Sequence, residues 1–202
     1  TIGMPRIVEA EEQVFVETFD NYTSENKGQY LDGSFIGNNG IEWNYVHARE
    51  GLIDGGTDYS IDGKGMILRR SGEGSKIYAT IDGGIKDFSV DLKKAMSNNN
   101  KRTVELFIND ESKGIFTLDN NNAGVQKFIV ENINVEGEFT LEIRHISGGS
   151  KNAQITIDNI TWTSYDGQPS ETIPVTNIAI NGEKEIAIVT STQLTIDYTP
   201  VN

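Results

Sequence analysis

Four side chains between positions 43 and 49 have the types and spacing to bind a sugar. Trp43, Tyr45, His47 and Arg49 share one phase of a period-2 pattern, and the residues between them share the other. In a strand this pattern sets two rings beside an imidazole and a guanidinium on one face. Rings stack on the apolar faces of sugars, and polar neighbours bind the hydroxyl groups. The alternative, which we favour, places Trp43 and Tyr45 in the core and lets His47 and Arg49 emerge at the strand end, because burying a charge is costly.

Tyr78 is a further candidate for ligand binding. Ile77, Ala79 and Ile81 alternate with Tyr78 and Thr80, so the tyrosine falls on the polar phase of its strand. An exposed ring there would be a secondary platform for a ligand.

Asp158 is the residue whose position most suggests a bound cation. It interrupts the apolar alternation that runs from Ile155 and Ile157 to Ile160 and Trp162. Polar residues inside an apolar strand suggest a β-bulge, which aims a carboxylate at something. Either a cation or a neighbouring loop amide would satisfy that carboxylate, and the sequence leaves both open.

Motifs for catalysis are missing from the sequence. The nearest approach to a nucleophile elbow, Gly148–Asn152, lacks the second glycine. An EF-hand-like start at Asp58 has Arg69 where the bidentate glutamate belongs. The two histidines, His47 and His145, lie on different predicted strands, and the many acidic residues make chance carboxylate pairs plentiful. We therefore assign no catalytic residues and expect that the chain is not an enzyme.

The amino-acid composition excludes several classes of binding partner. The 202 residues carry a formal net charge of −13, which disfavours phosphate backbones, so we expect no nucleic-acid binding by this segment. Cysteine is absent, which removes disulfides and thiolate metal sites. No apolar run approaches the length of a membrane helix, so we expect no membrane insertion.

The elements that must position these residues are strands almost throughout. Short alternating runs are separated by Gly, Asn, Asp and Ser clusters such as Asp62–Gly63, Asn98–Asn100 and Asn120–Asn122. Strands at such intervals predict an all-β sandwich or barrel. We expect a leader segment over residues 1–13, a β-sandwich over 14–166, a linker over 167–174 and a partial second domain over 175–202.

Two stretches resemble known families. Gly83–Val90, Val104–Asn109, Phe128–Gly137 and Ile155–Thr163 look like a jelly-roll (galactose-binding-like) accessory module, similar to the carbohydrate-binding modules of secreted bacterial enzymes and surface proteins. Val175–Gly182 and Gln193–Asn202 look like the opening half of a bacterial immunoglobulin-like group 2 domain.

The resemblance carries expectations about cofactor and context. Jelly-roll carbohydrate-binding modules often hold a structural calcium between their first and last strands, for which the matching carboxylates would be Glu17 or Asp20 early and Asp158 late. An immunoglobulin-like neighbour implies a modular protein, outside the cell or on its surface, with covalently linked domains.

Three functional hypotheses follow from these observations. The first is a non-catalytic module of a larger secreted or surface-anchored bacterial protein, directed at a glycan or a cell-surface polysaccharide. The second is a structural or adhesive spacer with no small-molecule ligand. The third is a hydrolase-associated domain whose catalytic part lies outside this chain. A row of exposed rings would favour binding, and a uniformly polar surface would favour a spacer.

Overall fold

The computed structural model describes residues 11–24, 28–51, 59–96, 98–147 and 153–167. Most of the predicted leader, nearly all of the predicted linker and the whole predicted immunoglobulin-like segment lie outside these ranges, so the domain boundaries stay predictions. In the part that is described, no helix is long and apolar enough to cross a membrane.

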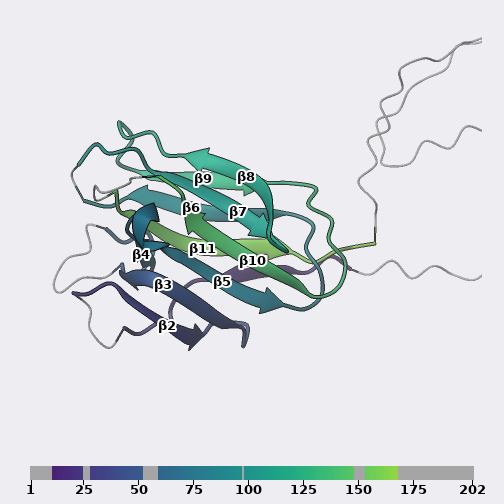
Figure 1. Cartoon of the computed structure of the whole chain (residues 1–202). Helices are drawn as coiled ribbons and strands as arrows, with labels where there is room; N and C mark the ends of the chain where they lie inside the picture. Colours follow the sequence, from purple (N-terminus) through teal and green to yellow (C-terminus); the bar gives the residue numbers. More distant parts are fainter. Residues whose placement is uncertain (1–10, 25–27, 52–58, 97, 148–152, 168–202) are drawn as a thin grey trace, which may run out of the picture. The chain divides into compact units, whose positions relative to one another are not determined.

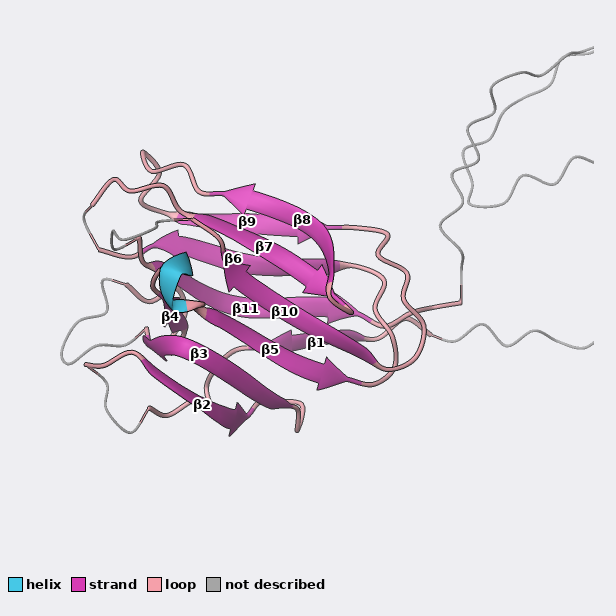
Figure 2. Cartoon of the chain, in the orientation of Figure 1, coloured by secondary structure: helices cyan, strands magenta, loops and turns pink. Residues whose placement is uncertain are grey.

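The described chain forms eleven strands and one 3-10 turn (Figure 1, Figure 2). The strands are β1 (Val14–Glu17), β2 (Leu31–Ile36), β3 (Glu42–Glu50), β4 (Met66–Leu68), β5 (Lys76–Ile81), β6 (Phe88–Lys94), β7 (Thr103–Ile108), β8 (Glu111–Thr117), β9 (Val125–Val130), β10 (Phe139–His145) and β11 (Ile155–Thr163). The 3-10 turn, Ser71–Glu73, lies between β4 and β5.

The strands pair antiparallel in the order β8-β7-β10-β5-β3-β4-β11-β6-β9, with β1 added beside β11 and β2 beside β3. This ladder folds over at β4, so that the layer of β2, β3, β5, β10, β7 and β8 faces the layer of β1, β11, β6 and β9 (Figure 1). The predicted all-β jelly-roll sandwich is therefore confirmed.

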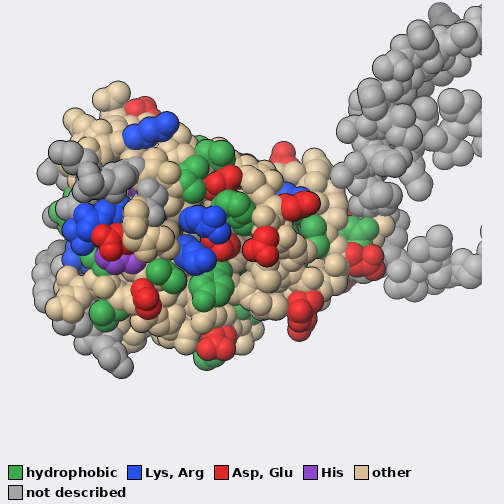
Figure 3. All heavy atoms as spheres, in the orientation of Figure 1, with side chains coloured by type: hydrophobic (Ala, Val, Ile, Leu, Met, Phe, Trp, Pro, Cys, Tyr) green, Lys and Arg blue, Asp and Glu red, His purple; other side chains and the backbone are tan. Residues whose placement is uncertain are grey.

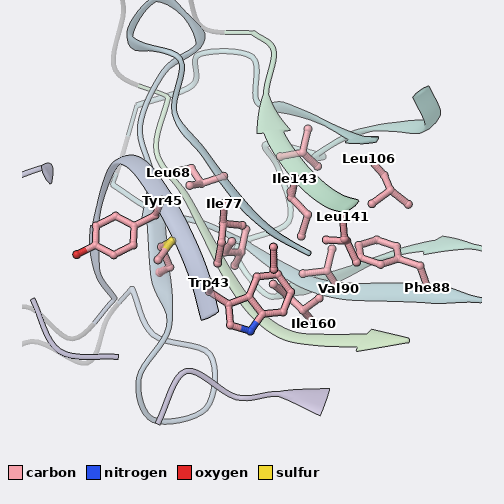
Figure 4. Close-up of a cluster of buried hydrophobic side chains, with 14 of the residues drawn as sticks. Trp43, Tyr45, Leu68, Ile77, Phe88, Val90, Leu106, Leu141, Ile143 and Ile160 are labelled. Atoms are coloured by element: carbon pink, nitrogen blue, oxygen red, sulfur yellow. The ribbon is translucent and has the colours of Figure 1, made fainter. Parts of the chain in front are cut away.

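Inward side chains of both layers form one core (Figure 4). The predicted alternation is confirmed in β5, β6, β7 and β10, where every second residue is buried. At the centre, Trp43 meets the indole of Trp162 edge to face, with ring centroids 6.1 Å apart. This contact joins β3 of one layer to β11 of the other.

A buried arginine organises the loops at one end of the sandwich. Arg102 precedes β7 and has no exposed surface. All three of its guanidinium nitrogens donate hydrogen bonds, at 2.7 to 3.1 Å, to oxygens of the loops between β6 and β7, between β8 and β9, and before β11. These acceptors belong to Ala95, Asn98, Asn100, Asn120 and Gln154. Burial lowers the pKa of Arg102, but arginine keeps its proton in proteins. The hydrogen bonds to these oxygens therefore stabilise a buried positive charge.

Arg102→Lys tests this arrangement. Lysine carries all its donors on one nitrogen, whereas the acceptors of Arg102 surround three nitrogens of a planar group. The lysine ammonium cannot reach all of them, so several buried oxygens would lose their partner. Each such loss costs about 1–3 kcal/mol, and we expect the free energy of unfolding to fall by about 3–5 kcal/mol in urea titrations. Arg144→Lys is the matched control, because Arg144 is partly exposed and pairs with Glu142; its effect should stay within about 1 kcal/mol. Equal stability of the two variants would contradict the role of Arg102.

Candidate functional site

A pocket of about 520 Å³ lies at the end of the sandwich where Gln154 leads into β11. Its lining comes from five separate segments: the approach to β2, the last part of β3, the residue after β4, Met96 in the loop after β6, and the residue before β11. The side chains that matter most below are those of Tyr30, His47, Arg49, Arg69 and Gln154. Figure 3 shows basic and histidine side chains gathered at the left end of the face, with further basic side chains over its centre, although the whole chain has a formal net charge of −13.

A β-bulge in β3 delivers two of these residues to the pocket. Leu31 pairs with Ala48 and Gly33 pairs with Tyr45, so β3 contains one residue more than β2 between these two pairs. His47 has a φ of 49°, and its backbone N–H donates to Asp32 Oδ1 at 2.8 Å instead of to the ladder. Bulges redirect side chains and are common beside functional sites. Here the bulge breaks the period-2 pattern that the sequence predicted through position 49.

The aromatic ring of Tyr30 is the centre of the pocket wall. The imidazole of His47 stacks on it with centroids 5.1 Å apart. The guanidinium carbons of Arg49 and Arg69 lie 4.9 and 5.0 Å from the ring centre. Cation–π contacts of this kind fix the cations in place.

The buried polar atoms of this wall that lack a hydrogen-bond partner among the described residues include His47 Nε2 and Arg49 Nε. Arg49 is only 8% exposed, and its Nη1 donates to the carbonyl of Gly28 at 3.2 Å. Burial lowers the pKa of His47, with Glu73 acting in the opposite direction, so the ring is neutral at pH 7. Buried polar atoms without a partner are costly, and a ligand that bonds them recovers that cost.

Trp43 and Tyr45 do not reach the pocket. Trp43 is fully buried and Tyr45 is 7% exposed, with its ring packed edge-on against Tyr22 at 5.2 Å. Gly33 covers Tyr45, because a Cβ at position 33 would lie 2.6 Å from the phenol oxygen. The hypothesis of an exposed Trp43–Tyr45 platform is therefore corrected: both rings fill the space between the layers, as the favoured alternative predicted for them. That alternative also predicted that Arg49 emerges from the core, whereas Arg49 is buried. His47 and Arg49 are separated from these rings by the bulge.

Tyr78 lies on a different surface, the outer face of the sheet. It is 38% exposed, with Lys76 Nζ 5.1 Å from its ring centre. Register places Tyr78 opposite Glu142, which lies opposite Phe107 in turn, so two rings flank a carboxylate across three strands. Tyr78 is thus not part of the pocket that holds His47 and Arg49.

The three predicted calcium ligands do not form one site. Glu17 is fully buried and accepts the backbone N–H groups of Phe19 at 2.7 Å and Asn38 at 3.0 Å. Asp20 is exposed and accepts the hydroxyl of Thr18 at 2.8 Å. Burial raises the pKa of Glu17, and the two backbone hydrogen bonds act in the opposite direction.

Asp158 sits in the predicted β-bulge, which the register shift between Asp158 and Thr161 confirms. Its two oxygens accept the backbone N–H of Asp62 at 3.1 Å and of Asn159 at 2.8 Å. Of the two explanations that the sequence left open, the loop amide is the one found in the structure. Among the described residues no group of three His, Cys, Asp or Glu side chains could hold a metal ion. Glu17, Asp20 and Asp158 therefore do not fit a shared calcium.

A lysine ammonium joins the beginning of β1 to the end of β11. Lys86 Nζ lies 3.2 Å from Glu12 Oε2 and 2.8 Å from Asp166 Oδ2. These two carboxylates raise the pKa of Lys86, so the ammonium stays charged. The first and last strands thus share a cation that the protein supplies itself.

Sequence reasoning missed Tyr30, Arg69 and Gln154. Their positions in the pocket depend on which loops meet, and no local pattern encodes that. One signal was available: Arg69 and Arg70 follow a short apolar strand in a chain with far more acidic than basic residues.

Comparisons with known proteins reveal distant likeness. No family model matches the sequence, and no curated protein matches it significantly. Among solved structures, the CBM36-1 domain of a multidomain xylanase from the hindgut metagenome of Trinervitermes trinervoides is 17% identical, with a TM-score of 0.43 over 75% of this chain and 96% of that one. The CBM29_1 module from Piromyces equi is 12% identical, with a TM-score of 0.45 over 77% and 92%. A family two carbohydrate esterase from Clostridium thermocellum is 16% identical, with a TM-score of 0.36, and only 26% of its chain is covered. Likeness at this level establishes no ligand or activity for this chain.

Trp43→Ala distinguishes a core residue from a platform. Removing a fully buried indole leaves a cavity between the layers, and we expect the free energy of unfolding to fall by about 3–5 kcal/mol. Tyr78→Ala removes an exposed ring and should cost about 1 kcal/mol or less. Urea unfolding followed by circular dichroism measures both. A Trp43→Ala variant as stable as the wild type would show that the indole is not part of the core.

The pH dependence of stability tests the environment of Asp158. Burial raises its pKa to about 7 from an ordinary 3.8, so the folded state keeps a proton that the unfolded state loses. The stability that this group contributes is present at low pH and is lost as the pH rises towards 7. His145 acts in the opposite direction, because burial lowers its pKa to about 4 and its contribution is lost as the pH falls from 6.5.

Asp158→Asn should therefore change the slope of stability against pH. Relative to the wild type, the variant should gain stability between pH 4 and pH 7, by roughly 4 kcal/mol at most. Urea unfolding across this range measures the difference in the free energy of unfolding between the variant and the wild type at each pH. A loss of stability that is the same at every pH does not affect how this difference changes with pH. A difference that does not change with pH would contradict the raised pKa.

Proposed function

We propose that this chain is a glycan-directed binding module that performs no catalysis itself and belongs to a larger secreted or surface-anchored bacterial protein. The observation that carries the proposal is the end pocket, in which Tyr30, His47, Arg49 and Gln154 converge around about 520 Å³. This volume lies within the range of small-molecule sites, roughly 300–1,000 Å³.

The chemistry of the pocket wall suits a hydroxyl-rich ligand. Arg49 Nε is a donor, His47 Nε2 is a donor or an acceptor according to tautomer, and both lack a partner among the described residues. Sugar hydroxyl groups donate and accept, so one ring could satisfy both atoms. The stacked pair of Tyr30 and His47 adds an apolar wall beside them.

The composition of the wall also supports binding without hydrolysis. Glycoside hydrolysis commonly uses two carboxyl groups that flank the scissile bond. The pocket-lining residues within the described ranges contain no carboxylate, and the nearby Glu73 pairs with Arg70. We therefore propose that any hydrolytic step of the parent protein belongs to another domain.

Calcium has no role at Glu17, Asp20 or Asp158 in this proposal. A structural neighbour was determined in complex with calcium and xylotriose, at 15% identity and a TM-score of 0.39, which transfers nothing to this chain. Because the pocket binds through its own side chains, we expect equal glycan binding with added calcium and with EDTA.

A glycan array screened with residues 1–202 tests the proposal, with calcium and with EDTA. His47→Asn keeps a residue that tolerates positive φ but removes the imidazole, so the bulge survives while the wall loses its ring and Nε2. We expect binding to weaken about 5- to 30-fold in this variant, which corresponds to about 1–2 kcal/mol.

Tyr78→Ala is the matched control, because Tyr78 lies on the outer sheet face. It should bind like the wild type if the pocket is the site. Loss of binding in Tyr78→Ala with none in His47→Asn would move the site to the sheet face. If no plant, fungal or bacterial glycan on the array binds, the alternative of a structural spacer is favoured.

A further inference from the structure

The pocket is basic in an acidic protein. The sequence has 30 acidic and 17 basic residues, yet Arg49 and Arg69 both line the pocket and Arg70 follows them. Among the described residues, two acidic side chains that approach the wall are already engaged: Glu73 pairs with Arg70 and lies 3.9 Å from His47 Nδ1, and Asp32 accepts the N–H of His47. A neutral sugar does not need this concentration of positive charge.

The guanidinium of Arg49 is held by two contacts that do not involve its Nε atom. The Tyr30 ring packs against the guanidinium, and the Gly28 carbonyl engages Nη1. The Nε atom is buried and has no partner among the described residues. The Nε edge of a guanidinium can pair side-on with a planar carboxylate through two parallel hydrogen bonds. Because Arg49 is more than nine-tenths buried, such a pair would form with little competition from water.

We propose that the pocket recognises a carboxylate-bearing sugar, that is, a uronic acid unit of an acidic glycan. The inference rests on the proposed function and names the ligand class of the same pocket. The sugar carboxylate pairs with the Nε edge of Arg49, and a ring hydroxyl bonds His47 Nε2. Arg69, on the same tyrosine ring, adds a second positive charge close to the carboxylate.

The geometry favours a carboxylate over other anions. A planar fork matches a planar acceptor, whereas a sulfate ester presents its oxygens tetrahedrally. In Arg49, Nη1 already donates to Gly28, so only the edge that contains Nε is left to pair with one planar acceptor. Sulfated glycans share the negative charge and are therefore the necessary comparison.

The experiment uses the full chain and isothermal titration calorimetry with three probes. These are a short oligogalacturonate, the same oligomer with its carboxylates methyl-esterified, and a sulfated galactan oligomer. Hydrogen bonds between charged partners contribute enough to expect about tenfold to hundredfold tighter binding of the acid than of the ester. Binding of the acid should also weaken as sodium chloride is added.

Arg49→Lys keeps the positive charge and removes the planar fork, so the preference for the acid over the ester should fall about tenfold or more. Arg144→Lys on the outer sheet face is the control and should keep the preference. Circular dichroism confirms that both variants are folded. Should Arg49→Lys not fold, Arg69→Gln provides the second variant, with a weaker preference for the acid expected.

The outcomes separate this inference from the proposed function. Equal binding of the acid and the ester overturns the acidic specificity and leaves glycan binding intact. Tighter binding of the sulfated oligomer than of the uronate also overturns it. If none of these oligomers and no glycan on the array binds, the proposed function fails together with the inference.

Discussion

The end of the sandwich that carries the pocket depends on one buried charge. Among the described residues, the guanidinium of Arg102 donates only to carbonyl and amide oxygens, which belong to three loops, and to no carboxylate. Removing such a cation from water is tolerable only when every donor is satisfied. The loops are therefore held in the one arrangement that supplies all the acceptors. One of those acceptors is the backbone carbonyl of Gln154, whose residue lines the pocket, so the same guanidinium that closes the core also positions part of the binding surface.

The β-bulges in β11 and β3 differ in how the polar side chains beside them are hydrogen-bonded. At Asp158 the bulge in β11 turns a carboxylate onto two backbone amides, and the result is a buried, satisfied group with a raised pKa. At His47 the bulge in β3 leaves two polar atoms of the pocket without partners among the described residues. The first bulge closes its hydrogen bonds within the fold, whereas the second leaves them open at a pocket. This difference, more than the presence of either bulge, is the reason to propose the pocket as a ligand site.

The fold was largely predictable from the sequence because the alternation of apolar and polar residues within each strand indicates which side chains face the core. Every second residue of β5, β6, β7 and β10 is apolar, and one-residue slips would expose the whole set, so the pattern predicts the faces. The bulge at Asp158 was predictable for the same reason, since polar residues break an apolar run. The bulge at His47 was not, because Trp43, Tyr45, His47 and Arg49 continue a period of two without interruption. What produces it is the pairing with β2 and the hydrogen bond to Asp32, which are non-local.

The course of the described chain places its first and last strand ends away from the pocket. Val14 pairs with Thr163, so the chain enters β1 and leaves β11 at the same place, where Lys86 bridges Glu12 and Asp166. The pocket lies by Gln154, at the other end of β11. That strand has nine residues, which at about 3.3 Å per residue separates the two ends by about 30 Å. The bridge that Lys86 makes between Glu12 and Asp166 therefore lies a strand's length from the pocket.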